Sequence, residues 1–165
     1  VEAACASAAA AGIVRAANLN APGQVVISGE PAAVDAACLA AKAKGARRAL
    51  RLEVSGAFHS PLMASAAAGL AAALETIEIR DADCPVVSNA WAKPVRKADE
   101  IRAALHEQLL APVRWEDSMR VLLDSGVEGF VPRVHAGTLP PLGDGARPTV
   151  RATRQSGVAN DRKQA

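Results

Sequence analysis

The 165-residue chain has almost no aromatic side chains: no tyrosine, two phenylalanines and two tryptophans. Half of its residues (50%) are hydrophobic, and alanine supplies much of that share. Alanine buries far less surface than leucine or an aromatic residue, so a core rich in alanine gains little free energy per residue. The length is sufficient for one core. We therefore expect a folded domain of marginal stability.

An excess of charge of one sign, paired cysteines and long apolar runs are also missing. The 19 Lys and Arg nearly balance the 17 Asp and Glu, which gives no reason to expect a nucleic-acid partner. Cys5, Cys38 and Cys84 have neither a CxxC motif nor zinc spacing, so no metal site is expected, and such cysteines are typical of a reducing cytoplasm. No apolar run approaches the ~20 residues that cross a bilayer. We expect a cytoplasmic protein without a membrane partner.

Helix and strand patterns alternate along the first 134 residues, which predicts an α/β or α+β layered fold. Segments bounded by proline and glycine predict helices over 1–11, 30–45, 61–76 and 98–126, the last broken at Pro112. Alternating or β-branched segments predict strands over 13–20, 21–29, 46–55, 84–90 and 127–134. Trp115 is expected to anchor the core. Gly, Pro, Arg and polar residues dominate 135–165 without a period, so we expect a disordered or loosely attached tail there.

The stretch VSGAFHSPLM, residues 54–63, holds the histidine of greatest interest. His59 follows a strand pattern and precedes Pro61, which suits the first turn of a helix. Histidine is the side chain best suited to act as a general base near neutral pH. By the residues alone, His59 is either such a base or an ordinary turn residue.

Four ordered segments resemble the malonyl-CoA:acyl carrier protein transacylases, the acyltransferases of fatty acid synthesis, which are close to those of polyketide synthases. The segments are AANLNAPGQVVISG, GARRALRLEVSGAFHSPLM, CPVVSNAWA and HEQLLAPVRWEDSM, within about residues 1–131. The resemblance implies the C-terminal portion of an α/β-hydrolase-like acyltransferase domain. Residues 1–54 would form a ferredoxin-like small subdomain whose first strand is missing, 55–134 part of the large subdomain, and 135–165 a divergent tail.

The resemblance also implies a reaction: malonyl transfer from malonyl-CoA to the phosphopantetheine thiol of acyl carrier protein, through a malonyl-serine ester. It implies that His59 is the catalytic base and that the main chain of Gln108 orients it. Phe58 would select malonyl, because a bulky residue there leaves no room for the extra methyl of methylmalonyl. Asn18 and Asn20 match an Asn-x-Asn that faces the active-site entrance, which implies substrate or carrier contact. No cofactor is implied beyond the phosphopantetheine that the partner carries.

The nucleophile of this reaction is missing from the sequence. No serine has the flanking glycines of a G-x-S-x-G elbow among Ser7, Ser28, Ser55, Ser60, Ser65, Ser88, Ser118, Ser125 and Ser156. The family's malonate-binding arginine and its oxyanion-hole residue belong to a segment that is also missing. We therefore expect this chain alone to be inactive.

Three hypotheses fit a chain with the base but not the nucleophile. It is a portion of a longer enzyme, as its start without Met inside an alanine-rich stretch suggests, or one chain of a two-chain enzyme. Alternatively, it is a catalytically inactive remnant, at most an interaction module that binds carrier protein through basic residues. Those residues are Lys42, Lys44, Arg47, Arg48 and Arg51.

Overall fold

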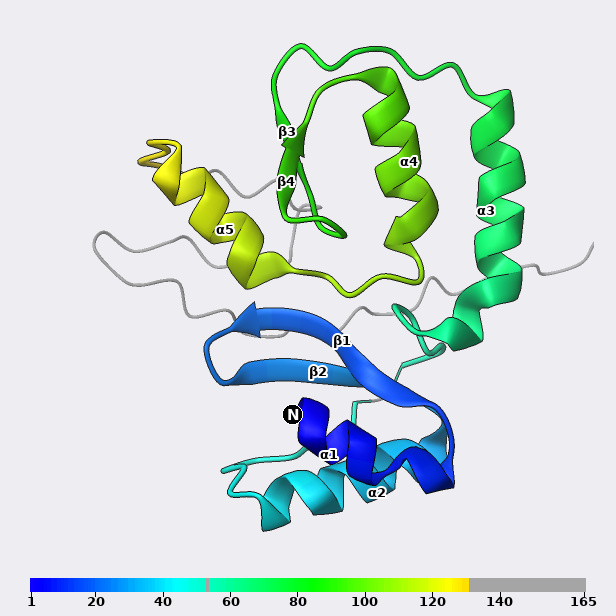
Figure 1. The fold of residues 1–165 in the computed structure, drawn as a ribbon, viewed down its shortest axis with the longest axis vertical. Coiled ribbons are helices and arrows are strands. Elements are labelled where there is room, and N and C mark those ends of the chain that lie inside the picture. Colours follow the sequence, from blue (N-terminus) through cyan, green and yellow to red (C-terminus); the bar gives the residue numbers. More distant parts are fainter. Residues whose placement is uncertain (53, 131–165) are drawn as a thin grey trace, which may run out of the picture. The chain divides into compact units, whose positions relative to one another are not determined.

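A computed structural model describes residues 1–52 and 54–130 (Figure 1). Helices and strands are mixed along this part of the chain, which confirms the coarse prediction of a fold with both helices and strands. The elements are α1 (Glu2–Ser7), η1 (Ala9–Ala11), β1 (Val14–Ala21), β2 (Gln24–Gly29), α2 (Pro31–Ala43), η2 (Pro61–Met63), α3 (Ala64–Thr76), β3 (Val86–Ser88), β4 (Lys93–Val95), α4 (Ala98–Gln108) and α5 (Trp115–Asp124). The tail predicted over 135–165 lies outside the described residues.

Strands β1 and β2 form an antiparallel hairpin. Its turn is Pro22–Gly23, and Gly23 has a φ of 77°. This pair suits a type II turn, in which proline fixes the first central φ and glycine accepts a positive φ at the second. Register shifts give β1 an extra residue at Ala17 and another at Asn20. Such bulges bend a strand and change the direction of its side chains.

Helices α1 and α2 lie side by side against this hairpin (Figure 1). Their buried positions carry small residues: Ala4 and Cys5 in α1, and Ala33 and Ala37 in α2. Small side chains let two helices approach closely, but they bury little apolar area. Burial raises the pKa of the Cys5 thiol, so Cys5 is a neutral packing residue near neutral pH.

The second half of the described chain pairs α3 with α4 and adds the β3–β4 hairpin and α5 (Figure 1). The guanidinium of Arg102 in α4 donates to the carbonyls of Leu74 and Ile77. These bonds fasten the C-terminal end of α3 to α4. Helix α5 contacts β3, β4 and also β1. Contacts through β1 therefore join the two halves of the described chain, which matters for the site below.

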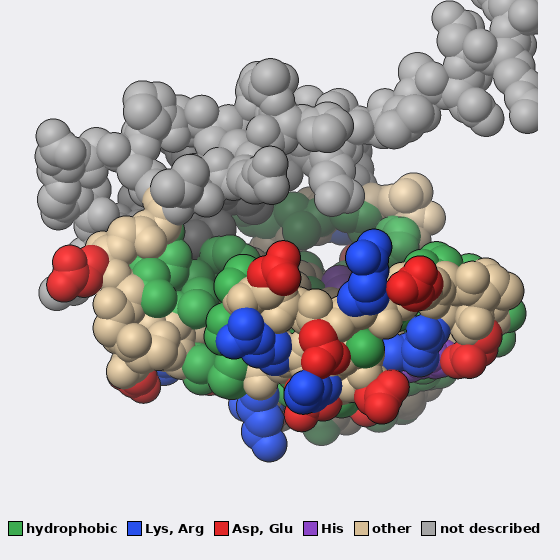
Figure 2. Space-filling view, turned by 90° about the horizontal axis from the view of Figure 1, so that it is seen from above, with side chains coloured by type: hydrophobic (Ala, Val, Ile, Leu, Met, Phe, Trp, Pro, Cys, Tyr) green, Lys and Arg blue, Asp and Glu red, His purple; other side chains and the backbone are tan. Residues whose placement is uncertain are grey.

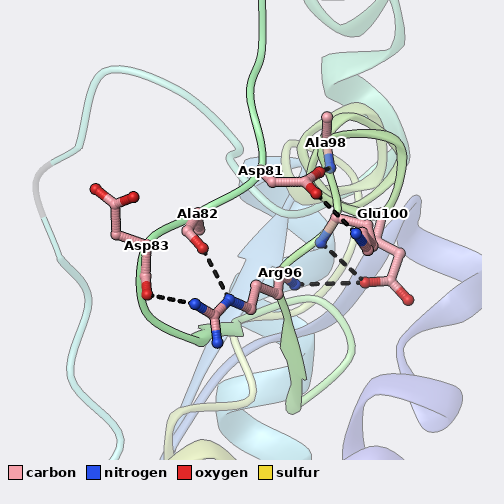
Figure 3. Close-up of polar contacts among 7 residues, drawn as sticks. Asp81, Ala82, Asp83, Arg96, Ala98 and Glu100 are labelled. Atoms are coloured by element: carbon pink, nitrogen blue, oxygen red, sulfur yellow. Dashed lines mark hydrogen bonds and ion pairs between the residues drawn. The ribbon is translucent and has the colours of Figure 1, made fainter.

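A remote carboxylate caps the start of α4 (Figure 3). Asp81 accepts from the backbone N–H of Ala98 at 2.9 Å and from Lys97 Nζ at 2.8 Å. Arg96 donates to the carbonyls of Ala82 and Asp83 at 2.9 and 2.6 Å, so the loop before β3 is fastened to the β4–α4 junction. The hydrogen bond from Lys97, reinforced by the bond from Ala98, holds the pKa of Asp81 below its ordinary value.

This depressed pKa predicts how acid affects stability. A lowered carboxyl pKa adds stability above the unfolded-state pKa, and this stability is lost as pH falls through the folded-state value. We expect wild type to melt at a higher temperature than Asp81→Asn near neutrality, and the gap to close from about pH 4 downward. Melting curves over a pH series measure this difference in melting temperature. An equal difference at every pH would contradict the lowered pKa of Asp81.

Most predicted elements form, but the strand predicted over 46–55 is wrong. Residues 46–52 and 54–55 have no strand structure, and Leu50, Leu52 and Val54 are exposed by 66%, 49% and 70%. A strand needs a partner for its backbone N–H and C=O groups, and the β1–β2 sheet has two strands in the described part of the chain. The strand predicted over 127–134 is likewise not formed at 127–130, while its remainder lies outside the described residues.

The core is made largely of alanine, as predicted. Among the described residues eleven hydrophobic side chains are buried, and eight of these are alanine; Leu74 and Val95 are the largest. Trp115 is 42% exposed, so its prediction as a core anchor is wrong. Acidic and basic side chains are interleaved on the face seen in Figure 2, which agrees with the balanced charge of the sequence.

Candidate active site

His59 sits in a loop whose backbone is unusual. Its φ is 61°, in the left-handed region that few residues other than glycine adopt, although histidine and asparagine do so more often than most. Its backbone N–H donates to the carbonyl of Leu109 at 3.1 Å. Strained conformations of this kind persist only when surrounding contacts hold them, and they cluster at functional sites.

The imidazole of His59 is held by two more carbonyls from the same distant segment. Nδ1 lies 3.1 Å from the oxygen of Gln108 and 3.0 Å from that of Ala111. Carbonyl oxygens only accept hydrogen bonds, so Nδ1 must carry the proton in the neutral ring. The lone pair is then on Nε2. This arrangement fixes both the tautomer and the ring direction, as a general base requires.

Ser60 fixes the turn immediately after the histidine. Its side chain is fully buried; Oγ donates to the carbonyl of Ala57 at 2.6 Å and accepts from the N–H of Leu62 at 3.3 Å. Ser60 is thereby the N-cap of η2, the helical turn that leads into α3. In the sequence His-Ser-Pro, His59 therefore has its ring held by hydrogen bonds, Ser60 caps the helical turn, and Pro61 begins that turn.

The segment that holds His59 is itself fixed to β1. Val113 N–H donates to Ala17 O at 2.8 Å, and Leu19 N–H donates to Val113 O at 2.9 Å. This pairing forms a parallel bridge between Asn18 and Val113. The bulge in β1 at Ala17 accompanies this extra partner on its second edge.

The predicted site residues are therefore only partly brought together. His59 and Gln108 are in contact, and Asn18 is linked to them through Val113. Phe58 precedes His59 and is 46% exposed. Asn20 lies at the second bulge of β1, and the described contacts do not join it to the histidine.

Two shallow hollows of about 430 and 390 Å³ are present, and His59 lines neither. Across residues 1–52 and 54–130, no three His, Cys, Asp or Glu side chains are placed to hold a metal ion. Nor is any helix in this range both long and apolar enough to cross a membrane.

The chain belongs to the acyl transferase domain family, whose pattern matches residues 2–136. Among curated relatives it is similar to the malonyl CoA-acyl carrier protein transacylase of Bacillus subtilis, with 48% identity over 119 residues that cover 72% of this chain and 38% of that protein. The Haemophilus influenzae protein of the same name is 44% identical over 124 residues, covering 75% and 40%.

Solved structures give the same result for the fold. An acyl carrier protein S-malonyltransferase from Vibrio cholerae superposes with a TM-score of 0.75 at 40% identity, over 77% of this chain and 42% of that one. The chain also matches a structure described as a type II PKS acyl-carrier protein in complex with its malonyl-transacylase. The TM-score is 0.74 at 46% identity, over 76% of this chain and 41% of the matched chain. The chain spans about two fifths of the length of these relatives.

Proposed function

We propose that this chain supplies the general base for malonyl transfer from malonyl-CoA to the phosphopantetheine thiol of acyl carrier protein. The observation that carries the proposal is the doubly held Nδ1 of His59, which leaves Nε2 as the proton acceptor. The relatives' names supply the reaction. The nucleophilic serine comes from a part of the enzyme outside this sequence, because no serine here stands in a G-x-S-x-G elbow.

The proposed reaction has two matched halves. In the first, Nε2 of His59 takes the serine hydroxyl proton, the serine oxygen attacks the malonyl thioester carbonyl, and CoA leaves as its thiol with that proton. In the second, Nε2 takes the proton of the phosphopantetheine thiol, whose sulfur attacks the malonyl-serine ester. The serine oxygen leaves and recovers the proton from the imidazolium. His59 is therefore unchanged after each cycle.

The finer assignments belong to the same proposal. Asn18 is the candidate for substrate or carrier contact, because its strand pairs with the segment that holds His59; Asn20 joins it on sequence grounds alone. Phe58, beside the base and 46% exposed, is the residue that selects malonyl. Cytoplasm is the proposed location.

The subdomain arrangement is also proposed. Residues 1–54 form an incomplete ferredoxin-like subdomain, supported by the order α1–β1–β2–α2, and 55–134 belong to the large subdomain. A tail over 135–165 completes the division. Residues 46–52 and 54 have no strand partner in the described part of the chain, and this is expected if the sheet of the subdomain is incomplete.

A second candidate is an interaction module without catalysis. Lys42, Lys44, Arg47 and Arg48 are all exposed, and Arg51 is exposed although it pairs with Asp35 at 3.0 Å. Such a basic segment suits an acidic carrier protein. This candidate requires binding but no proton transfer at His59, so activity separates it from the first.

A fusion enzyme tests the first proposal. The parts of the Bacillus subtilis transacylase that this chain does not cover are joined to this chain, and malonyl transfer to acyl carrier protein is measured. We expect activity from the fusion, and an unmodified intact mass when the chain alone meets malonyl-CoA. A folded but inactive fusion supports the interaction module instead. A malonyl adduct on the chain alone would mean that it contains its own nucleophile.

A further inference from the structure

We infer that Trp91 and Arg114 are positioning residues that brace the segment holding His59; the inference rests on the proposed role of His59 as a base. The indole N–H of Trp91 donates to Glu107 Oε2 at 2.7 Å. Arg114 Nη1 donates to the carbonyl of the same Trp91 at 3.2 Å. One residue of the β3–β4 turn is thus tied to the chain at two points, Glu107 and Arg114.

The hydrogen bonds that hold His59 within the described residues come from between those two points. The carbonyls of Gln108, Leu109 and Ala111 receive its Nδ1–H or its backbone N–H. The carbonyl of Glu107 in turn accepts from the N–H groups of Leu110 and Ala111 at 3.1 and 2.8 Å, which folds the segment into a tight turn. A brace across 107–114 therefore sets where these carbonyls point.

The Arg114 end of the brace is fixed by several bonds. Its Nε and Nη2 both reach Asp117 Oδ2, at 2.9 and 2.7 Å, and its backbone N–H donates to Asn89 O at 3.0 Å. Its own carbonyl accepts from Ser118 N–H and Oγ at the start of α5. Arg114 thus joins the β3–β4 turn, α5 and the His59-holding segment, which is more than a surface ion pair does.

The same helix offers a matched control. Arg120 pairs with Glu116 at 2.6 Å, also within one turn of α5, but its described contacts do not reach the β3–β4 turn. Loss of either arginine removes one charge and one local ion pair. Only loss of Arg114 opens the brace.

The test measures the His59 tautomer directly in this chain, labelled with ¹⁵N at histidine, by long-range ¹H–¹⁵N NMR. Wild type is expected to hold the proton on Nδ1. Arg114→Met is expected to lower the ratio of Nδ1–H to Nε2–H about fivefold, the equivalent of one neutral hydrogen bond. Trp91→Phe, which removes the indole N–H but keeps an aromatic ring, is expected to shift the ratio in the same direction by less, and Arg120→Met to leave it unchanged.

Each result decides the inference. A wild-type ratio in Arg114→Met and Trp91→Phe, with both variants folded by circular dichroism, overturns it. If Arg114→Met fails to fold, Trp91→Phe decides: it keeps an aromatic side chain, and a wild-type ratio in this folded variant is equally contradictory. Equal shifts in Arg114→Met and Arg120→Met would show a general effect of charge, which also overturns the brace.

The tautomer readout is independent of activity, so it separates this inference from the proposed function. An inactive fusion with the expected shifts would refute the base role and leave the brace intact. An active fusion whose Arg114→Met variant keeps the wild-type kcat and the wild-type tautomer would support the base role and refute the brace. In an active fusion we expect Arg114→Met to lower kcat about tenfold with little change in KM, because orientation rather than binding is lost.

Discussion

Replacement of His59 by asparagine in the active fusion lowers kcat for malonyl transfer by about 10⁴-fold, the usual effect of losing one member of a catalytic serine–histidine group. Asparagine cannot take a proton at neutral pH, so neither half of the transfer has a base. Asparagine is preferred over alanine here because it tolerates the left-handed backbone, and residue 59 has a φ of 61°. Steady-state kinetics with malonyl-CoA and acyl carrier protein measure the loss.

His106→Asn is the matched control. His106 lies on α4, where Nε2 is 3.4 Å from Glu75 Oε1 on α3, and its described contacts do not reach His59. Its loss is expected to leave kcat within about twofold, because a partly exposed pair contributes little. If His59→Asn keeps activity within about tenfold of wild type while remaining folded, His59 is not the base.

Local chemical signals predicted much of the fold. Pro31 and Pro61 mark helix starts, and Pro22–Gly23 marks the turn of the β1–β2 hairpin. These signals work because proline fixes its own φ and glycine accepts a positive φ, and neither property depends on distant contacts. The break expected at Pro112 is also present, between α4 and α5, although the two helices end and begin several residues away from it.

The wrong strand prediction over 46–55 shows where local pattern fails. Leu50, Leu52 and Val54 alternate with charged residues as a strand does, yet all three are exposed. Alternation predicts which face a strand would bury, but pairing requires a neighbouring backbone that the sequence of the segment does not reveal.

The site was predictable only where the family resemblance supplied a role. His59 and the Gln108 main chain were expected to be neighbours, and the structure places them 3.1 Å apart. The second carbonyl, from Ala111, and the brace of Trp91 and Arg114 were not expected. They depend on backbone atoms and on contacts across 16 and 23 positions of sequence, which residue types do not encode.

Replacement of Ser60 by alanine destabilises this chain by about 2 kcal/mol, since it removes a helix cap and leaves the part-buried Ala57 carbonyl without its donor. Ser60 is 0% exposed, and its Oγ serves both the Ala57 carbonyl and the Leu62 N–H. Urea unfolding followed by circular dichroism measures the change. For a chain with an alanine core such a loss is a large part of its total stability.

Ser125→Ala is the control that separates the effect of burial at Ser60 from the effect of losing a hydroxyl hydrogen bond. Ser125 Oγ donates to Leu122 O at 2.7 Å, also three residues back, but the residue is exposed, so water replaces the lost donor. We expect a cost below about 0.5 kcal/mol there. Equal costs at both serines would contradict the claim that burial makes Ser60 important. A large cost at Ser60 alone would mean that the hydroxyl cap holds the turn carrying His59, in addition to the carbonyls of Gln108, Leu109 and Ala111.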